Sequence, residues 1–390
     1  MSGRLLVQQT NSGPLTTDNS LPCPLMKEYD YLLLGHGIAG ATLAWELRRR
    51  GRTVLVLDAA RPDSASKVAA GLMNPVAGKR FALAWRADEL LTAAGALYRE
   101  MEQHFGQQFF FELPIWKLFS SVAEQNTMLA RSADQPWQDF VENAGAALPA
   151  VSGVRDEFGG LHIRRGGYVR LRELLSALTA EQLASGGLQH ETFNWEQLVT
   201  GPTGITYAGR VRAQHFVCCE GAAAIENPYF QWLPLTPNQG EVLDVECPGL
   251  AEAQVLNKGA YVVPLGNGRF RVGATYRWPP FAEGTTPEAR VELSERLASA
   301  TSLPFTVQAQ WAGVRPAVRD RKPLLGRHPE VLGVSIFNGF GSKGVMLAPR
   351  LAALLADHLE NPEAELWPEV NIKRYQALYQ TASRAVGFSS

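Results

Sequence analysis

The residues of this chain with the clearest chemical potential form a glycine turn near its start, Gly35-His36-Gly37-Ile38-Ala39-Gly40. Their types and spacing suit the binding of a dinucleotide. Gly35 permits a tight turn, Gly37 lets the backbone approach a pyrophosphate, and Gly40 lets a helix pack closely on a strand. The free N–H groups and the positive dipole end of that helix, with Ile38 and Ala39 in its first turn, would then face the phosphates.

The segments around the turn have the order strand, turn, helix, strand. An apolar run at residues 31–34 precedes the turn, a helix-compatible segment follows it, and a second apolar run at residues 54–57 ends on Asp58. A carboxylate at that position can accept hydrogen bonds from the ribose hydroxyls of a dinucleotide. A glycine turn alone can be merely structural, but the flanking strands and the acid in register favour the dinucleotide interpretation.

The composition fits one large domain or two interleaved domains, since the chain has 390 residues, of which 46% are hydrophobic and 19% charged. A net charge of -1 gives no indication of electrostatic binding to nucleic acid or to an anionic membrane. The cysteines Cys23, Cys218, Cys219 and Cys247 have neither metal-site nor disulfide-framework spacing, and the adjacent pair is expected in the core. No apolar run reaches the roughly 18 residues of a membrane helix.

Residues 1–25 differ from the rest of the chain because they are polar and rich in Pro, Ser and Thr. They lack the apolar core of a signal peptide. Met26 would make a natural start for the sequence that follows. We therefore expect residues 1–25 to be a disordered extension or a start-site artefact.

Helical and strand-like patterns alternate at both ends of the remaining chain, with antiparallel-looking strands between them. Helical patterns lie at residues 39–50, 87–105, 171–185, 287–298 and 345–359. Strand-like runs lie at residues 54–57, 109–113, 215–219, 241–246, 259–264, 270–275 and 331–337. This order predicts a parallel nucleotide-binding sheet assembled from separated segments, with an inserted α+β substrate domain.

Five blocks of sequence, taken in order, resemble the D-amino-acid oxidase-like FAD-dependent oxidoreductases, which include glycine oxidase, sarcosine oxidase and the FAD domain of a bifunctional tRNA-modifying enzyme. The resemblance covers about residues 27–360. The blocks are the glycine turn with Asp58, Ser66–Leu72, Gly166–Val169, Gly259–Pro264 with Gly273–Thr275, and Trp311–Pro316 followed by Asp320, Pro323–Gly326, Asn338–Gly344 and Ala348-Pro349.

The resemblance implies an α/β fold, α+β overall, in which a Rossmann-type FAD-binding domain with a parallel sheet is interleaved with an antiparallel-sheet substrate domain. The implied boundaries are residues 26–105, 165–230 and 305–390 for the FAD-binding domain, and residues 106–164 and 231–304 for the substrate domain.

The resemblance also implies FAD as the cofactor. The segment Ser66–Leu72 would follow the ribityl chain, and Gly339–Gly344 would direct N–H groups and a helix N-terminus at the flavin pyrimidine ring. That second segment can also be a plain helix-capping loop. Because no cysteine lies near Gly313, where sarcosine oxidases link their flavin, we expect non-covalent FAD. The expected FAD-binding residues are Gly35, Gly37, Ile38, Ala39, Gly40, Asp58, Ala59, Ser66, Lys67, Ala70, Gly71, Leu72, Phe193, Gly339, Phe340, Gly341, Ser342, Lys343, Gly344 and Val345.

Two residues match family positions that hold a substrate carboxylate. Arg315 has the forked guanidinium that suits a bidentate carboxylate contact, and Tyr261 would bring its hydroxyl to the same group. Each has a structural alternative, since Arg315 could form a salt bridge with nearby Asp320 and Tyr261 could be a core aromatic residue. Tyr276 could line the same pocket or pack in the core.

Family members oxidise a C–N bond by hydride transfer to flavin N5, which needs orientation more than acid–base groups. The absence of a histidine triad or metal cluster is therefore compatible with the family, and His36 is expected to point outward from its turn. Lys343 stands beside the place where glycine oxidase has a second arginine. Because lysine does not replace arginine in a bidentate contact, this difference puts glycine or sarcosine as substrate in doubt.

The expected function is that of a cytoplasmic FAD-dependent amino-acid or secondary-amine oxidoreductase, with no metal, no membrane span and no bound nucleic acid. The electron acceptor, O₂ or another, is not determined by the sequence. Two alternatives stay open. One is a tRNA oxidoreductase acting on a carboxymethylaminomethyl uridine, and the other is a flavin electron-transfer subunit without turnover of its own.

Overall fold

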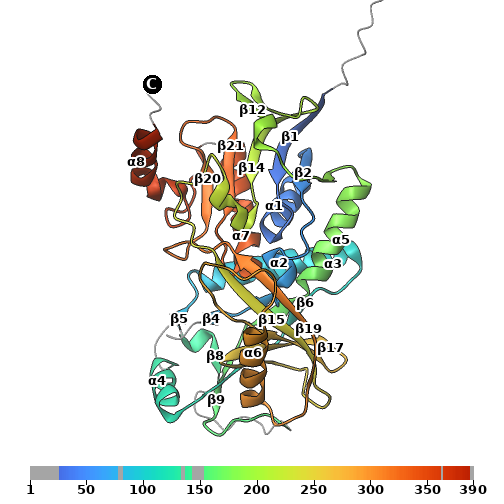
Figure 1. The fold of residues 1–390 in the computed structure, drawn as a ribbon, viewed down its shortest axis with the longest axis vertical. Coiled ribbons are helices and arrows are strands. Elements are labelled where there is room, and N and C mark those ends of the chain that lie inside the picture. The colour runs from blue at the N-terminus through green and yellow to red at the C-terminus, as the bar shows by residue number, and fades with distance from the viewer. Residues whose placement is uncertain (1–25, 78–81, 133–136, 143–152, 362, 387–390) are drawn as a thin grey trace, which may run out of the picture.

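The computed structural model describes residues 26–77, 82–132, 137–142, 153–361 and 363–386. The expectation for residues 1–25 lies outside these residues. Two large sheets lie one above the other in the view of Figure 1, and the chain crosses between them repeatedly. This arrangement confirms the expected mixed fold with parallel and antiparallel sheets. The exact domain boundaries stay a prediction.

The upper sheet has a parallel centre. In order across the sheet its parallel strands are β11 (Leu188–His190), β2 (Val54–Asp58), β1 (Lys27–Leu34), β14 (Val211–Cys218) and β21 (Val334–Asn338). Strand β2 is apolar and buried up to Asp58, and β1 and β14 are apolar and buried at their carboxyl-terminal ends, as strands covered on both faces must be. The antiparallel additions are the hairpin β12 (Leu198–Gly201) and β13 (Gly204–Tyr207) beside β14, and β20 (Leu324–Arg327) beside β21.

Helices cover this sheet through their apolar faces. Helix α1 packs on α7, and α7 packs on α3, which joins three distant parts of the chain in one core. The helices around the sheet are α1 (Ile38–Arg49), α3 (Ala87–Phe105), α5 (Leu171–Ala184) and α7 (Gly344–Glu360), with α8 (Gln376–Val386) near the end of the chain. The adjacent cysteines Cys218 and Cys219 are buried and free, as expected of core residues.

The lower sheet is mostly antiparallel, and α6 (Pro287–Ala300) packs against it. Its strands in order are β19 (Thr306–Arg315), β15 (Asn238–Glu246), β18 (Arg269–Gly273), β17 (Ala260–Gly266), β16 (Val255–Lys258), β7 (Ile115–Leu118), β9 (Gly160–Ile163) and β8 (Val141–Glu142). Shorter elements outside the two large sheets are α2 (Ala65–Val68), β3 (Leu72–Met73), β4 (Val76–Ala77), β5 (Ala82–Leu83), β6 (Phe110–Glu112) and β10 (Gly167–Val169). Helix α4 (Val122–Ser132) lies beside the lower sheet in Figure 1.

The helix predictions agree with the structure to within about two residues at each end, and each expected strand corresponds to an observed one. The long strand β19 was not expected. Its sequence, TVQAQWAGVR, alternates polar and apolar residues and has mostly intermediate exposure, so it lacks the apolar run that indicates a buried strand. This omission matters because β19 ends on Arg315.

One ion pair fixes the lower sheet to the segment that follows β2. Arg271 of β18 donates to both carboxylate oxygens of Asp244 on β15, at 2.7 and 2.8 Å. The same guanidinium donates to the backbone oxygens of Val68 and Ala69, at 3.4 and 3.2 Å. Trp311 of β19 adds a hydrogen bond to Asp244 at 2.9 Å. The position of residues 68 and 69 therefore depends on charged groups of the lower sheet.

Arg172 of α5 holds the neighbouring residue of this segment. Its guanidinium donates to the backbone oxygen of Lys67 at 3.2 and 3.1 Å, and its Cζ lies 4.3 Å from the Trp311 ring centroid. Burial opposes ionisation of Asp244, but the hydrogen bonds from Arg271 and Trp311 outweigh it and leave the pKa of Asp244 below its usual value. The carboxylate is therefore charged at neutral pH.

Substitution Asp244→Asn should destabilise the protein, because it leaves the Arg271 guanidinium buried without its counter-ion. We expect a loss of about 3 kcal/mol in the free energy of unfolding, measured by denaturant titration. Glu28→Gln is the matched control, since Glu28 and Arg212 form an exposed pair at 3.8 Å and should contribute less than about 1 kcal/mol. Equal effects of the two substitutions would contradict this assignment.

Candidate active site

The expected FAD-binding residues gather at one edge of the upper sheet. Because β1, β2, β14 and β21 are parallel, their carboxyl ends share that edge. Gly35 follows β1, Asp58 ends β2, and Gly339 follows β21. Helix α1 leads from β1 to β2 on one side, while β14 and β21 lie on the other side of β1. Ligands bind at such a switch point in open α/β sheets.

The glycine turn has a geometry that only glycine fits. Gly35 has φ of +99°, and a Cβ there would lie 2.7 Å from the backbone oxygen of Cys219. A Cβ on Gly40 would lie 1.9 Å from the backbone oxygen of Gly35. Helix α1 begins directly after Gly37, which gives it no side-chain cap. The Ile38 N–H donates to Ser66 Oγ at 3.0 Å, so Ser66, an expected FAD-binding residue, lies at the helix N-terminus.

Asp58 also stabilises the turn itself. Its carboxylate accepts a hydrogen bond from the backbone N–H of His36 at 2.6 Å and another from that of Ala60 at 2.7 Å. Each oxygen of a carboxylate can accept a second hydrogen bond. The turn and the expected ribose contact therefore depend on the same side chain.

The expectation that His36 points outward is wrong. Its side chain is buried, and Nδ1 lies 3.1 Å from Thr179 Oγ1 of helix α5. The packing of α5 on this turn could not be read from the local sequence. Burial lowers the pKa of His36 to about 4, so the imidazole is neutral at physiological pH and brings no positive charge to the turn.

The segment Ser66–Leu72 runs from the glycine turn toward the lower sheet. Gly71 has φ of +69°, and a Cβ there would lie 1.9 Å from the backbone oxygen of Val169. Ala70 is buried beside it. The Lys67 ammonium donates to the backbone oxygen of Arg61 at 2.8 Å. The chain path is thus fixed by backbone packing and by the Arg271 and Arg172 contacts.

The segment Gly339–Gly344 brings positive charge to the same edge. Gly339 and Gly341 have positive φ values of 78° and 55°, and helix α7 begins at Gly344 with no side-chain cap. Lys343 lies at the N-cap, where burial and nearby Arg321 lower the pKa of its ammonium. Within the described residues no carboxylate forms an ion pair with Lys343. This arrangement suits an anionic group.

Phe193 follows β11 at the same edge. Its ring stacks on Tyr207, with centroids 4.5 Å apart, and on Phe216 at 5.4 Å. The side chain is therefore part of an aromatic cluster behind the sheet edge. The expected contact of its backbone amide with adenine stays a prediction.

Arg315 and Tyr261 lie on one face of the lower sheet. Arg315 is directly opposite Asn238 in the β19–β15 ladder, and its Nη1 donates to Asn238 Oδ1 at 2.9 Å. Tyr261 is directly opposite Gly273 in the β17–β18 ladder. Since β15 pairs with both β19 and β18, the register places the two side chains over the same face.

Two glycines that we did not expect in the site make room for these side chains. A Cβ on Gly240 would lie 1.9 Å from Arg315 Nη2, and a Cβ on Gly273 would lie 2.6 Å from Tyr261 Oη. Gly273 belongs to a block that carried the family resemblance, but its role as space for Tyr261 follows only from strand pairing. Apart from its residue type, nothing in the sequence predicted that Gly240 makes room for Arg315.

Arg315 does not form the salt bridge that was its structural alternative. Asp320 pairs instead with Arg374, at 2.9 Å. Within the described residues Arg315 has no carboxylate partner, and its other hydrogen bonds go to the backbone oxygen of Thr275 at 3.4 Å. Burial lowers the pKa of Arg315, and nearby Tyr261 and Tyr276 partly offset this. The site therefore presents a partly desolvated cation that can bind a carboxylate.

Comparison with known proteins identifies the family. The sequence profile described as FAD dependent oxidoreductase matches residues 30–358. The chain belongs to this FAD-dependent oxidoreductase family. The oxidoreductase is 26% identical to glycine oxidase of Geobacillus kaustophilus, over 86% of this chain and 94% of that protein. It is 30% identical to the tRNA 5-methylaminomethyl-2-thiouridine biosynthesis bifunctional protein MnmC of Maricaulis maris, over 84% of this chain and 51% of that protein.

Solved structures agree on the fold. Iminodiacetate oxidase from Chelativorans sp. BNC1 superposes with a TM-score of 0.74 at 23% identity, covering 88% of this chain and 98% of that one. The structure of glycine oxidase from Geobacillus kaustophilus gives 0.71 at 24% identity, with the same coverage. The cofactor of this oxidoreductase is FAD. The glycine turn and the N-termini of α1 and α7, whose N-cap residues make no side-chain hydrogen bond to the helix, fit its phosphates and flavin.

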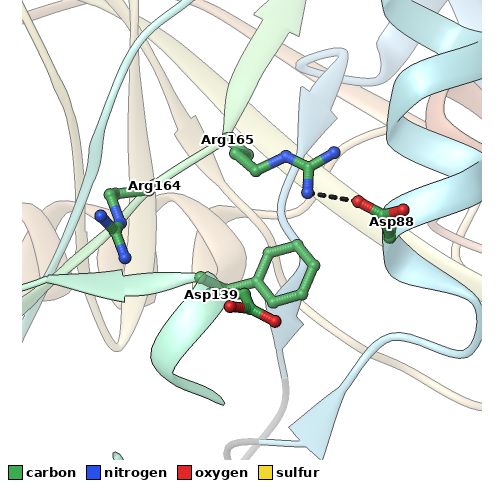
Figure 2. Close-up of a pocket in the computed structure, with 5 residues that line it drawn as sticks. Asp88, Asp139, Arg164 and Arg165 are labelled. Atoms are coloured by element: carbon green, nitrogen blue, oxygen red, sulfur yellow. Dashed lines mark hydrogen bonds and ion pairs between the residues drawn. The ribbon is translucent and has the colours of Figure 1, made fainter. Parts of the chain in front are cut away.

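A surface pocket of the oxidoreductase lies apart from these residues. It is lined by Asp88, Asp139, Phe140, Arg164 and Arg165. Figure 2 shows Arg165 facing Asp88, with a hydrogen bond of 2.5 Å. The Arg165 guanidinium also lies 5.3 Å from the Phe140 ring centroid. None of the residues expected to bind flavin or substrate lines this pocket, so we do not assign it to the reaction.

In the part of the chain that the structure describes, no cluster of three or more His, Cys, Asp or Glu could hold a metal ion. No helix there is long and apolar enough to span a membrane.

Substitution Gly240→Ala should weaken the binding of a small carboxylate such as acetate to the FAD-loaded protein. The added Cβ would displace the Arg315 guanidinium while leaving the FAD-binding edge untouched. We expect a dissociation constant roughly tenfold to a hundredfold higher, measured from the change in the flavin spectrum.

The control for this experiment is Gly201→Ala, because a Cβ there meets nothing closer than 3.8 Å. Gly201→Ala should bind acetate like the natural protein. The role of Gly240 would be refuted if Gly240→Ala also bound acetate unchanged.

The flavin should be released completely when the protein is unfolded by heat or acid. No cysteine lies at the position near Gly313, and Cys218, Cys219 and Cys247 are buried and free. We expect all of the yellow colour in the supernatant after the protein is precipitated, and a protein mass without an added flavin. Colour retained in the pellet would show a covalent bond.

Proposed function

We propose that this oxidoreductase oxidises the C–N bond of an amino acid or a carboxylate-bearing secondary amine. The observation that carries the proposal is the Arg315 guanidinium, which is partly desolvated and lacks a carboxylate partner within the described residues. A buried cation is unfavourable unless an anion pairs with it. A substrate carboxylate would supply that charge.

Arg315 and Tyr261 would orient the substrate from the lower sheet. Arg315 would form a two-point contact with the carboxylate, and the Tyr261 hydroxyl would add a donor on the same face. Bound FAD supplies the acceptor for the hydride that leaves the substrate carbon. The residues of this chain then need to hold the reacting C–H bond toward the flavin and exclude water, rather than to transfer a proton.

The FAD-binding residues would act through backbone groups and two helix N-termini. The N–H groups in the first turn of α1 other than that of Ile38, which Ser66 accepts, would bind the pyrophosphate, and Asp58 the ribose. The start of α7 with Lys343 would place positive charge beside the flavin pyrimidine ring. That charge would stabilise the anionic reduced flavin relative to the oxidised form.

A second candidate function is oxidation of a carboxymethylaminomethyl group on a tRNA uridine. It is favoured by the 30% identity to MnmC of Maricaulis maris, of which this chain spans about half. It would also use Arg315 for a carboxylate. Its distinguishing requirement is tight tRNA binding that weakens steeply with salt. An electron-transfer subunit, by contrast, has no need of a carboxylate-binding arginine.

The proposal is tested by adding amino acids and secondary amines to the FAD-loaded protein without oxygen. Bleaching of the flavin band by one class identifies the substrate. Arg315→Leu should then raise the concentration needed for half-reduction by about a hundredfold or more, because a charge-assisted two-point contact is lost.

Two controls make this test specific. Arg212→Gln removes an exposed arginine of β14 and should leave reduction unchanged. The methyl ester of the best substrate should react poorly with the natural protein and be insensitive to Arg315→Leu. Reduction of Arg315→Leu at natural concentrations would overturn the proposal, and bleaching by no small amine would favour the tRNA substrate.

A further inference from the structure

Two large aromatic side chains are exposed beside the carboxylate site. Tyr276 has 58% of its surface exposed and Trp278 has 56%. Their rings contact each other edge to face, with centroids 5.5 Å apart. Most large aromatic side chains of a soluble protein are mainly buried, and single exposed ones need no explanation. Two exposed rings in contact at a binding site do need one.

Strand pairing places these rings on the face that carries Arg315. The backbone of Arg277 pairs with that of Gln239, with hydrogen bonds in both directions at 3.0 and 2.9 Å. Because side chains alternate along extended chain, Tyr276 and Trp278 point to the face opposite that of Arg277. That is the face of Gly240, over which the Arg315 guanidinium lies. The Arg315 Cζ is 5.4 Å from the Tyr276 ring centroid.

We propose that Tyr276 and Trp278 form a stacking surface for an aromatic group of the substrate, whose carboxylate is bound by Arg315. The substrate class is then an amino acid, or an N-substituted amino acid, with an aromatic or heteroaromatic ring. This inference rests on the proposed function for the carboxylate contact. It goes beyond that function by naming the group that the site selects.

The distances suit a ring that is close to the carboxylate. A carboxylate oxygen bound to Arg315 lies about 3 Å from a guanidinium nitrogen. Two or three bonds from the carboxyl carbon, as in phenylacetate and phenylalanine, therefore bring a ring within stacking distance of Tyr276, with Trp278 beside it. An aromatic pair contributes about 0.5–1.5 kcal/mol beyond its buried area, so two rings would favour an aromatic group over an aliphatic one of equal size.

The charges around the rings favour a small ligand over a nucleic acid. Exposed aromatic rings bind single-stranded nucleic acid when they lie in a positively charged groove. Arg277, which stands between the two rings in the sequence, points to the opposite face and pairs there with Glu292 at 3.9 Å, so it brings no positive charge to the rings. Arg315, by contrast, has no carboxylate partner within the described residues. The arrangement thus fits a single carboxylate with an attached ring.

The inference is tested with phenylacetate, cyclohexylacetate and acetate, added to the FAD-loaded protein and followed by the flavin spectrum. Phenylacetate should bind about fivefold or more tightly than cyclohexylacetate, although cyclohexylacetate is the more apolar ligand. Tyr276→Leu combined with Trp278→Leu should abolish this preference. The ratio of the two affinities is the readout, because Tyr276 also lies against Arg315 and its loss changes the affinity for every carboxylate, acetate included. Tyr276→Phe combined with Trp278→Phe should retain the preference.

A control variant outside the site is Leu332→Ala, because Leu332 is 69% exposed and lies in the connection between β20 and β21. It should behave like the natural protein with all three ligands. Anaerobic reduction by phenylalanine and cyclohexylalanine, each as both enantiomers, gives a second measure of the same preference.

The outcomes separate the two proposals. If Arg315→Leu weakens all three ligands but phenylacetate and cyclohexylacetate bind equally to the natural protein, the carboxylate site stands and the aromatic surface is refuted. A preference that survives in the double leucine variant also refutes the surface. If an oligoribonucleotide, but no aromatic carboxylate, quenches the tryptophan fluorescence in a salt-dependent way, and Trp278→Phe removes that quenching, the rings bind nucleic acid and this inference falls.

Discussion

The geometry of the site depends on the buried pair of Arg271 and Asp244. The pair belongs to the lower sheet, but the guanidinium also binds the backbone oxygens of Val68 and Ala69, in the segment that leaves the parallel sheet. The lower sheet carries Arg315 and Tyr261, and the segment belongs to the expected flavin site. One buried ion pair therefore links the sheet that carries the proposed carboxylate-binding residues to the proposed flavin-binding segment.

Two further cations of the site have no counter-ion within the described residues. Arg315 lies on the sheet face and Lys343 at the start of helix α7, and burial lowers the pKa of both. An unpaired buried charge opposes folding, because no ion pair in the folded state compensates for its lost hydration. Their retention is accounted for if a substrate carboxylate and an electron-rich flavin supply the missing negative charge. The neutral His36, by contrast, adds no positive charge to the glycine turn.

The exposed rings of Tyr276 and Trp278 lead to a proposed substrate that differs from the substrates named for two relatives. The relatives named above include oxidases of glycine and of iminodiacetate, both small and without rings. At identities of 23% and 26% the shared features are the fold and FAD. In this chain the residues around the proposed carboxylate contact include two aromatic side chains open to solvent.

The sequence by itself determined the features that depend on neighbouring residues. The glycine turn, Asp58 and helix α1 follow one another along the chain, and only glycine can adopt the turn, so their arrangement is local. Tertiary structure decided the features that depend on pairing between distant strands. The register of β19 on β15 places Arg315 over Gly240. The packing of α5 buries His36, and Asp320 pairs with Arg374 instead of with Arg315. Strand register and helix packing are set by the sum of many contacts across the chain, so no local pattern specifies them.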